Sequence, residues 1–272
     1  MSEPVGRLRE TAWCPGCGNF NILKSLDRAI AECGLDRRKL VLVSGIGQAA
    51  KLPHYTDANV FNGLHGRALP AATGIKLANH ELEVIITSGD GDMYGEGGNH
   101  FLHGIRRNIG VKCFVHNNQV YGLTKGQASP TSDPGFVTKV QVHGVISVPV
   151  NPIALAIVES CTFVARSSAV VPEHLQKMMV AAIRHRGFAL LDILQPCVTF
   201  NRVNTWMWYK QRVRELAADY DPTDRALALE TAFRWGEEIP IGIIYRCERK
   251  TFEEQQPALS RGPLALTYGK VP

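Results

Sequence analysis

The stretch that decides the fold begins at Ser88-Gly89-Asp90-Gly91-Asp92 and ends at Asn117-Asn118-Gln119-Val120. Each end follows a short apolar run rich in β-branched residues, 84–87 before the first and 111–115 before the second. Such runs are typical of strands buried inside a parallel sheet. Because adjacent parallel strands end at the same edge, we expect the Gly-Asp-Gly turn and the Asn-Asn pair to lie side by side.

Asp90 and Asn118 would then hold one cation between them at this edge. Oxygen ligands suit Mg²⁺, which usually keeps water and a phosphate oxygen in its shell, so the pattern predicts a diphosphate site. Gly89 and Gly91 let the backbone approach phosphates closely. A helix expected to begin near Gly95 would direct its N-terminal dipole at them.

Two other interpretations of the Gly-Asp-Gly turn are an ordinary turn and a calcium loop that starts at Asp90. The calcium loop fails because Tyr94 stands at its fifth position and Phe101 at its twelfth, where a bidentate Glu is required. Together with the Asn-Asn pair, the turn resembles the thiamine diphosphate (TPP) motif of TPP-dependent enzymes. The resemblance implies that Asp90, Asn118 and the backbone carbonyl of Val120 bind Mg²⁺.

Length and composition narrow the class of protein. The 272 residues suffice for one α/β domain with a trailing segment, and 45% hydrophobic with 20% charged residues is ordinary for a globular protein. The net charge of +5 is mild and its basic residues are scattered, which gives no support for nucleic acid binding. No apolar stretch reaches the roughly 18 residues of a membrane span. Because residues 1–4 also lack a signal-peptide pattern, we expect a cytoplasmic protein without a membrane span.

Seven cysteines in such a chain favour thiols that act as ligands or as small buried side chains. Cys14 and Cys17 form a Cys-x-x-Cys pair, and Cys197 lies in a loop after the apolar run 188–194. Zinc, an iron–sulfur cluster and a redox dithiol all use such a pair, and the spacing does not choose among them. The strand that precedes Cys197 would carry this third thiol to the same sheet edge.

The remaining pattern alternates strands and helices, which predicts a mostly parallel α/β sheet with helices on both faces. A strand over 40–43 leads into a glycine-bearing turn at 44–51, and a helix over 68–78 follows His65. The long polar loop 119–137 is expected to be functional. We predict a domain over 1–205 and a C-terminal extension over 206–272, with a helix at 211–218, that packs on the domain or on a partner subunit.

Several further motifs match one family: Trp-Cys-Pro-Gly-Cys-Gly-Asn, Ser-Gly-Ile-Gly, Leu-His-Gly-Arg-Ala-Leu-Pro and Gln-Pro-Cys-Val-Thr-Phe-Asn. With the TPP motif, they make residues 10–205 resemble the β subunit of a 2-oxoacid:ferredoxin oxidoreductase. The resemblance implies a TPP-binding, pyrophosphate-type module that holds Mg²⁺, TPP and one [4Fe-4S] cluster. It also implies an α subunit that completes the active site, with γ and ferredoxin-like δ subunits as further candidates, and ferredoxin as electron carrier.

Carried over residue by residue, the resemblance assigns Cys14, Cys17 and Cys197 to the cluster. Lys51 and Lys125 fall where the family presents side chains to the substrate, and either ammonium could neutralise a carboxylate or be a solvated surface lysine. The positions assigned to cofactor contact are Ile46, Gly47, Gln48, His65, Gly89, Asp90, Gly91, Asp92, Asn118, Gly122 and Leu123.

Gln48 is a departure, because the family usually has Gly-Ile-Gly-Cys where this chain has Gly-Ile-Gly-Gln. An amide oxygen is a hard ligand and replaces a thiolate poorly on iron. The outcomes left open are a four-iron cluster with a non-cysteine or solvent ligand, a three-iron cluster, recruitment of another cysteine, and loss of the cluster.

The implied reaction is oxidative decarboxylation of a 2-oxo acid with coenzyme A to acyl-CoA and CO₂, or its reverse, with TPP as electron sink. A non-oxidative TPP-dependent decarboxylase or lyase subunit is the first alternative, and Gln48 is the residue that favours it. A non-catalytic thiol-redox or zinc-binding scaffold is the second.

Overall fold

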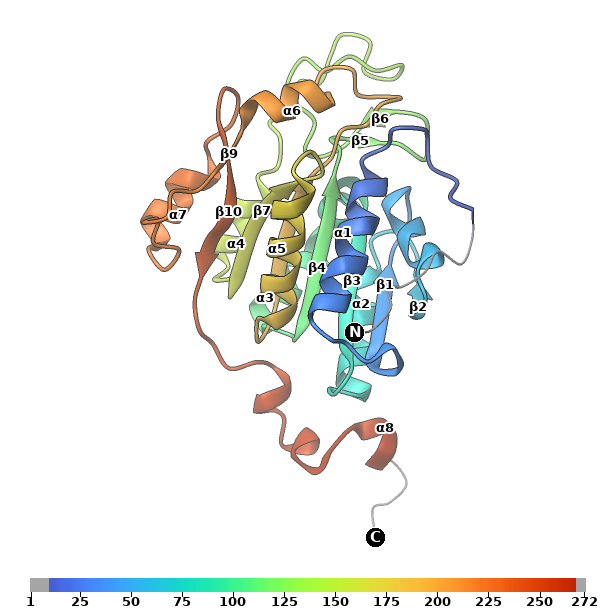
Figure 1. The fold of residues 1–272 in the computed structure, drawn as a ribbon, viewed down its shortest axis with the longest axis vertical. Helices are drawn as coiled ribbons and strands as arrows, with labels where there is room; N and C mark the ends of the chain where they lie inside the picture. Colours follow the sequence, from blue (N-terminus) through green and yellow to red (C-terminus); the bar gives the residue numbers. More distant parts are fainter. Residues whose placement is uncertain (1–9, 268–272) are drawn as a thin grey trace.

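The computed structural model describes residues 10–267 and is organised around an eight-stranded sheet (Figure 1). The first six strands across the sheet are parallel, whereas the last two run in the opposite direction. In order, they are β2 (Asn59–Asn62), β1 (Leu40–Ser44), β3 (Glu83–Gly89), β4 (Val111–Asn117), β8 (Ala189–Leu194), β7 (Phe163–Ser168), β10 (Ile239–Arg246) and β9 (Val213–Glu215). A separate hairpin pairs β5 (Val120–Tyr121) with β6 (Gln127–Ala128).

Helices cover both faces of the sheet (Figure 1). One face carries α1 (Asn19–Glu32) and α5 (Pro172–Arg184), which pack against each other. The other carries α2 (Ala68–Ala78), α3 (Gly98–Arg107) and α4 (Pro152–Val158). The later helices are α6 (Trp206–Arg212), α7 (Arg225–Ala232) and α8 (Leu264–Thr267). None of the helices within residues 10–267 is long and apolar enough to cross a membrane.

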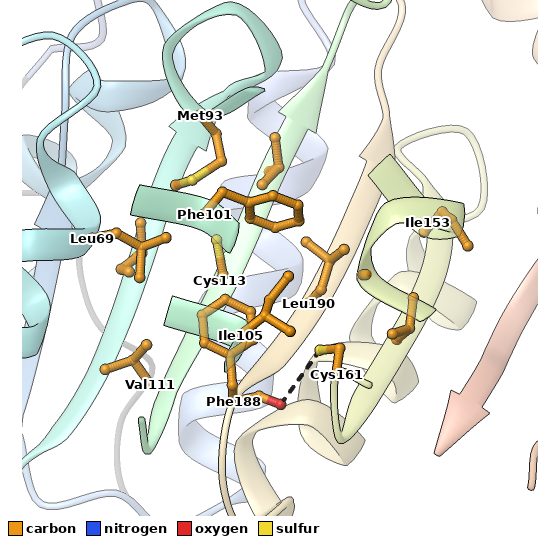
Figure 2. Close-up of a cluster of buried hydrophobic side chains, with 14 of the residues drawn as sticks. Leu69, Met93, Phe101, Ile105, Val111, Cys113, Ile153, Cys161, Phe188 and Leu190 are labelled. Carbon is orange, nitrogen blue, oxygen red and sulfur yellow. Dashed lines mark hydrogen bonds between the residues drawn. The ribbon is translucent and has the colours of Figure 1, made fainter. Parts of the chain in front are cut away.

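Two hydrophobic cores lie on opposite sides of the sheet, and β3 shows why its sequence is a continuous apolar run. Successive strand side chains point to opposite faces. Ile85 therefore joins the core under α1 and α5, whereas Val84 and Ile86 join the core under α2 and α3. Figure 2 shows the second core, in which Phe101 of α3 lies over the sheet. A strand covered on both faces has no polar side to display.

The structure confirms the parallel α/β architecture and the predicted neighbours β3 and β4. A helix follows the Gly-Asp-Gly turn as expected, but it does not begin at Gly95: a π-helix spans Gly91–Glu96, and α3 begins at Gly98. The Gly97 N–H donates to the Asp92 carbonyl at 2.9 Å, five residues back, so the turn is widened.

The helix predicted over 211–218 is also wrong. α6 ends at Arg212, and Val213 then pairs with Ile239 of β10 in the sheet. Tertiary pairing therefore overrides the local pattern of this segment. The proposed C-terminal extension contributes two strands to the sheet, and Trp206 Nε1 donates to the Gly16 carbonyl at 3.0 Å. The division at residue 205 stays a prediction.

Candidate cofactor site

Four loops meet at the carboxyl edge of the parallel strands, at the top of Figure 1. They follow β1, β3, β4 and β8 at residues 45–48, 90–92, 118–122 and 195–197; the second runs into the π-helix Gly91–Glu96, and the third includes β5. This is the edge at which open parallel sheets bind ligands. The sequence prediction that the Gly-Asp-Gly turn and the Asn-Asn pair adjoin is confirmed, since Gly89 pairs with His116 at the strand ends.

Asp90 is one of two buried carboxylates of the site, with only 1% of its surface exposed. Its Oδ2 accepts hydrogen bonds from the hydroxyls of Ser129 at 2.5 Å and Thr131 at 2.7 Å, and the Asn118 backbone donates a further one. Burial nonetheless raises the pKa of Asp90 to about 6, because the neutral donors only partly offset desolvation. A divalent cation would stabilise this charge, so Asp90 fits the predicted role as a metal ligand.

Asp92 holds two neighbouring loops in place. Its Oδ1 accepts from the backbone N–H groups of Ile46 at 3.0 Å and Gly66 at 2.7 Å, and its Oδ2 from the Ser88 hydroxyl at 2.6 Å. A Cβ on Gly45 would lie 2.0 Å from Asp92 Oδ2, so glycine is required there. The visible role of Asp92 is thus to position the loops, while its contact with TPP stays a prediction.

His65 lies at the rim of this arrangement with 38% of its side chain exposed. Its Nδ1 is 2.9 Å from Asp92 Oδ1 and 3.3 Å from Glu96 Oε2, although neither contact has hydrogen-bond geometry. Tyr121 donates its hydroxyl to Glu96 at 3.2 Å. Burial, followed by the charge of Glu96, raises the pKa of Tyr121, so this hydroxyl stays a donor.

The other predicted contact residues line the same loops. Asn118 Oδ1 accepts a hydrogen bond from the Val120 N–H at 3.1 Å, which orders two of the three predicted magnesium ligands relative to each other. Lys51 is partly buried in the 3₁₀ helix Ala49–Tyr55, and Lys125 is exposed in the loop between β5 and β6 with a left-handed φ of 81°. The substrate roles of Lys51 and Lys125, and the TPP contacts of Gly47, Gly122 and Leu123, stay predictions.

Beside these loops, a cavity of about 30 Å³ brings together the three predicted cluster cysteines. Cys14, Cys17 and Cys197 line it with Gln48 and Gln195, and we call it the cysteine pocket. The Cys17 N–H donates to the Cys14 carbonyl at 3.0 Å and closes the Cys-x-x-Cys turn. Asn118 and Gly122 border the pocket too, so it adjoins the predicted TPP site directly.

The polar groups of the cysteine pocket are only partly paired. Burial raises the pKa of the Cys17 thiol, and the nearby thiols of Cys197 and Cys14 add to the rise. Gln195 Nε2 donates to Cys17 Sγ at 3.5 Å. The side-chain oxygens of both Gln48 and Gln195 are buried without a hydrogen-bond partner. Within residues 10–267, no three His, Cys, Asp or Glu side chains are gathered as a ready set of metal ligands.

Sequence reasoning missed four residues that shape the site. Ser129 and Thr131 bind Asp90 from the loop 119–137, and their only signal was the polarity of that loop. In the turn after β1, the sequence analysis assigned a role to Gly47 but not to Gly45. Gln195 was noted only as part of the Gln-Pro-Cys motif. The local sequence does not indicate that its amide contacts Cys17.

Comparison with known families agrees with this geometry. Residues 44–193 match the family model of the thiamine pyrophosphate enzyme C-terminal TPP binding domain. Residues 197–261 match the family model for the C-terminal part of the pyruvate ferredoxin oxidoreductase beta subunit. We call the loops at 45–48, 90–92 and 118–122 the TPP edge, after their predicted ligand. The two family models meet at the loop that carries Cys197, between the TPP edge and the cysteine pocket.

Individual relatives extend the match to nearly the whole chain. The 2-oxoacid:ferredoxin oxidoreductase subunit beta of Saccharolobus solfataricus is 48% identical over 93% of this chain and 87% of its own length. The corresponding subunit of a Sulfolobus species is 45% identical over 95% of this chain and 89% of its own length. A solved 2-oxoglutarate:ferredoxin oxidoreductase of Magnetococcus marinus, with 2-oxoglutarate, coenzyme A and succinyl-CoA bound, superposes with a TM-score of 0.92 at 35% identity, covering 94% of this chain and 88% of that one. The chain therefore belongs to the family of 2-oxoacid:ferredoxin oxidoreductase β subunits.

Proposed function

We propose that this chain is the TPP-binding subunit of an enzyme that oxidatively decarboxylates a 2-oxo acid with coenzyme A, or runs the reverse reaction, and transfers the electrons to ferredoxin. The observation that carries the proposal is the shared border of the two sites. Asn118 and Gly122 belong to the predicted TPP edge and also line the cysteine pocket. A one-electron acceptor placed beside the carbon chemistry is what separates this reaction from simple decarboxylation.

The residues present fit the diphosphate and its metal. Asp90 is a buried carboxylate whose hydrogen-bond partners are all neutral, Asn118 lies next to it, and Val120 follows in the same loop. Asp90, Asn118 and the Val120 carbonyl would hold Mg²⁺, and the open space beside Gly47 and Gly89 would accommodate the phosphates. When bound, TPP supplies an electron sink for the carbanion of decarboxylation.

The chain itself would contribute positioning and charge. Asp92 accepts hydrogen bonds from the N–H groups of Ile46 and Gly66, so contacts within the chain itself would position these two loops for the cofactor. Lys51 and Lys125 are the cations we assign to the carboxylate of the 2-oxo acid. The three thiols of the cysteine pocket would bind an iron–sulfur cluster, which iron and sulfide analysis can test.

An α subunit is the expected partner, and the sheet edge next to the site is a surface that such a partner would cover. All four residues of β2 are exposed, among them Val60 at 45% and Phe61 at 47%. Leu64, which follows β2, is 75% exposed. An uncovered edge strand with apolar side chains is a feature that proteins usually cover. A cytoplasmic location is inferred from the seven cysteines, none of which is in a disulfide.

The test is reconstitution of the purified complex with TPP, Mg²⁺, coenzyme A and a panel of 2-oxo acids under anaerobic conditions. We expect reduction of ferredoxin that depends on both coenzyme A and a 2-oxo acid. The non-oxidative alternative, which Gln48 favours, predicts CO₂ release with no electron acceptor reduced. Absence of saturable, Mg²⁺-dependent TPP binding by the complex would remove both enzymatic interpretations and favour the scaffold.

A further inference from the structure

A large cavity opens at the amino edge of the sheet, where the parallel strands begin, and we call it the basic cavity. Its volume is about 1030 Å³, and it lies between the end of α5, the start of β7 and the segment 246–250 at the end of β10. Figure 1 shows this segment leaving the sheet at the end away from the four loops of the cofactor site. Sites for small molecules usually measure about 300–1,000 Å³, so a nucleotide-sized ligand would fit.

The walls of the basic cavity carry an excess of positive charge. Glu248 is the single carboxylate of the lining, and a second carboxylate, Asp221, lies outside it within range of the charge of Arg246. His185 also lines the cavity but is neutral near pH 7, because burial, and then the charges of Lys112 and Arg246, lower its pKa to about 4. The permanent cations of the lining are Arg184, Arg186, Arg246, Arg249 and Lys250.

Three of these cations are available to a ligand. Within residues 10–267, no carboxylate forms an ion pair with Arg184, Arg246 or Lys250, and all three side chains are exposed. Arg186 differs from them, because it pairs with Glu254 at 2.6 Å. A hollow lined by charges of one sign focuses the electric field and concentrates ions of the opposite sign. The basic cavity should therefore attract anions.

The segment 246–250 is held in place by the chain, so its cations do not lie on a loose tail. The Cys247 N–H donates to the Thr162 carbonyl at 3.1 Å, and Asn108 Nδ2 donates to the carbonyls of Arg249 and Lys250 at 3.2 and 3.3 Å. The Arg249 guanidinium donates to two further backbone carbonyls at 2.8 and 2.7 Å. The wall is therefore formed without a ligand, and Arg249 supports it.

The surroundings of the basic cavity favour a small ligand over a protein partner. The core of a protein–protein interface is apolar and depleted of charge. None of the exposed large hydrophobic side chains within residues 10–267 belongs to the lining. Guanidinium groups match the oxygens of phosphate with paired N–H donors. Phe163 and Ile243 add an apolar part to the wall, against which the organic part of a ligand could lie.

The basic cavity is too far from the cofactor site to hold the reacting end of a substrate. It is lined by Phe163, the first residue of β7, whereas the loops of the cofactor site lie at the opposite ends of the parallel strands. A strand of six residues, such as β7, spans about 20 Å. A ligand in the basic cavity therefore occupies a separate site.

We propose that the basic cavity is a second binding site, distinct from the cofactor site, for a small ligand with at least two phosphate groups. Arg184, Arg246 and Lys250 bind the phosphates, and the apolar wall accepts any organic part. A nucleoside diphosphate and a free polyphosphate share this chemistry, and the experiment separates them.

The experiment is calorimetric titration of the full chain with inorganic triphosphate and, separately, with ADP. The buffer is depleted of metal ions, so that the carboxylates of Asp90 and Asp92 repel anions from the TPP edge. We expect saturable binding to one site, with an affinity that falls as the salt concentration rises. Tighter binding of ADP would identify a nucleotide as the ligand, whereas equal binding would show that the phosphates suffice.

A double substitution locates the site. Arg246→Gln combined with Lys250→Gln should weaken binding of both probes by about tenfold or more, because two cations of the wall are lost. The matched control combines Arg202→Gln with Lys210→Gln, which removes the same two charges from exposed positions in the segment that follows the cofactor-site loop at 195–197. This control should bind as the parent does, and circular dichroism checks that both variants are folded.

Three results would overturn the inference. They are no saturable binding by the parent, unchanged affinity in the cavity variant, and an equal loss of affinity in the cavity variant and its control. An oligoglutamate peptide that binds as tightly as triphosphate would overturn the choice of phosphate and favour an acidic segment of a protein. None of these results bears on the proposed oxidoreductase function, which the reconstitution experiment tests independently.

Discussion

The TPP edge and the cysteine pocket share a border but differ in how their polar groups are satisfied. At the TPP edge, Asp92 and Asp90 accept several hydrogen bonds from the chain itself. In the cysteine pocket, two amide oxygens have no partner. The first region is therefore organised by hydrogen bonds within the chain, whereas the second keeps acceptors that the chain does not satisfy. Four substitutions test this difference, in order of expected effect.

Asp92→Ala should have the largest effect, a loss of free energy of unfolding on the order of 4 kcal/mol, because two backbone N–H groups and a buried hydroxyl lose their acceptor. Urea unfolding measures it. Asp36→Ala is the control, since Asp36 binds only the backbone N–H and guanidinium of the exposed Arg38, and its loss should cost far less than the loss of Asp92. Equal stability of the two variants would show that the TPP edge is not organised by Asp92.

Asp90→Asn tests the buried charge through pH. The folded pKa of about 6 lies above the ordinary value of 3.8, so the stability that Asp90 contributes is fully present below pH 3.8 and is lost as pH rises through about 6. The shift corresponds to about 3 kcal/mol. Unfolding of the metal-free chain followed against pH should show this decline, and Asp90→Asn should flatten it.

The affinity for Mg²⁺ and TPP should depend on pH in the opposite direction from the free energy of unfolding. Mg²⁺ requires the carboxylate, so the affinity for Mg²⁺ and TPP should rise as pH increases through about 6. Calorimetric titration at several pH values measures this dependence, and Asp90→Asn should bind weakly throughout. An affinity independent of pH in this window would contradict the role assigned to Asp90.

Gly45→Ala should cost about 2 kcal/mol, because the new methyl group overlaps the Asp92 carboxylate and must displace it. Gly74→Ala is the matched control. Gly74 lies inside α2 with open space around its Cβ position, so this change should stabilise the chain by about 0.5–1 kcal/mol. Thermal unfolding compares the two, and opposite signs are expected.

Gln195→Met should have the smallest effect and should stabilise the cofactor-free chain by about 1 kcal/mol, since it removes a buried oxygen that has no partner. Gln119→Met is the control of equal burial. Both ends of the Gln119 amide are paired, with the Thr131 carbonyl and the Tyr209 hydroxyl, so its loss should destabilise. If both variants destabilise alike, the contrast between the two regions fails.

Much of the fold could be predicted because it rests on local rules. The apolar runs before Asp90 and Asn117 are buried strands, and α2 covers the expected residues 68–78. The structure of the segment after Trp206 could not be predicted, because β9 forms only by pairing with β10, about two dozen residues later. A short strand that gains its hydrogen bonds from a distant partner leaves little local pattern.

The sequence by itself determined the types of ligand group: a carboxylate and an amide after adjacent strands, and three thiols in loops. Their chemistry is carried by residue identity and spacing, which do not depend on packing. Only the tertiary structure decided which groups are paired. It places Ser129 and Thr131 on Asp90 and brings Gln195 to Cys17 across 178 positions of sequence. Hydrogen bonding and burial depend on contacts between distant segments, so the unpaired oxygen of Gln48 becomes visible only once the chain is folded.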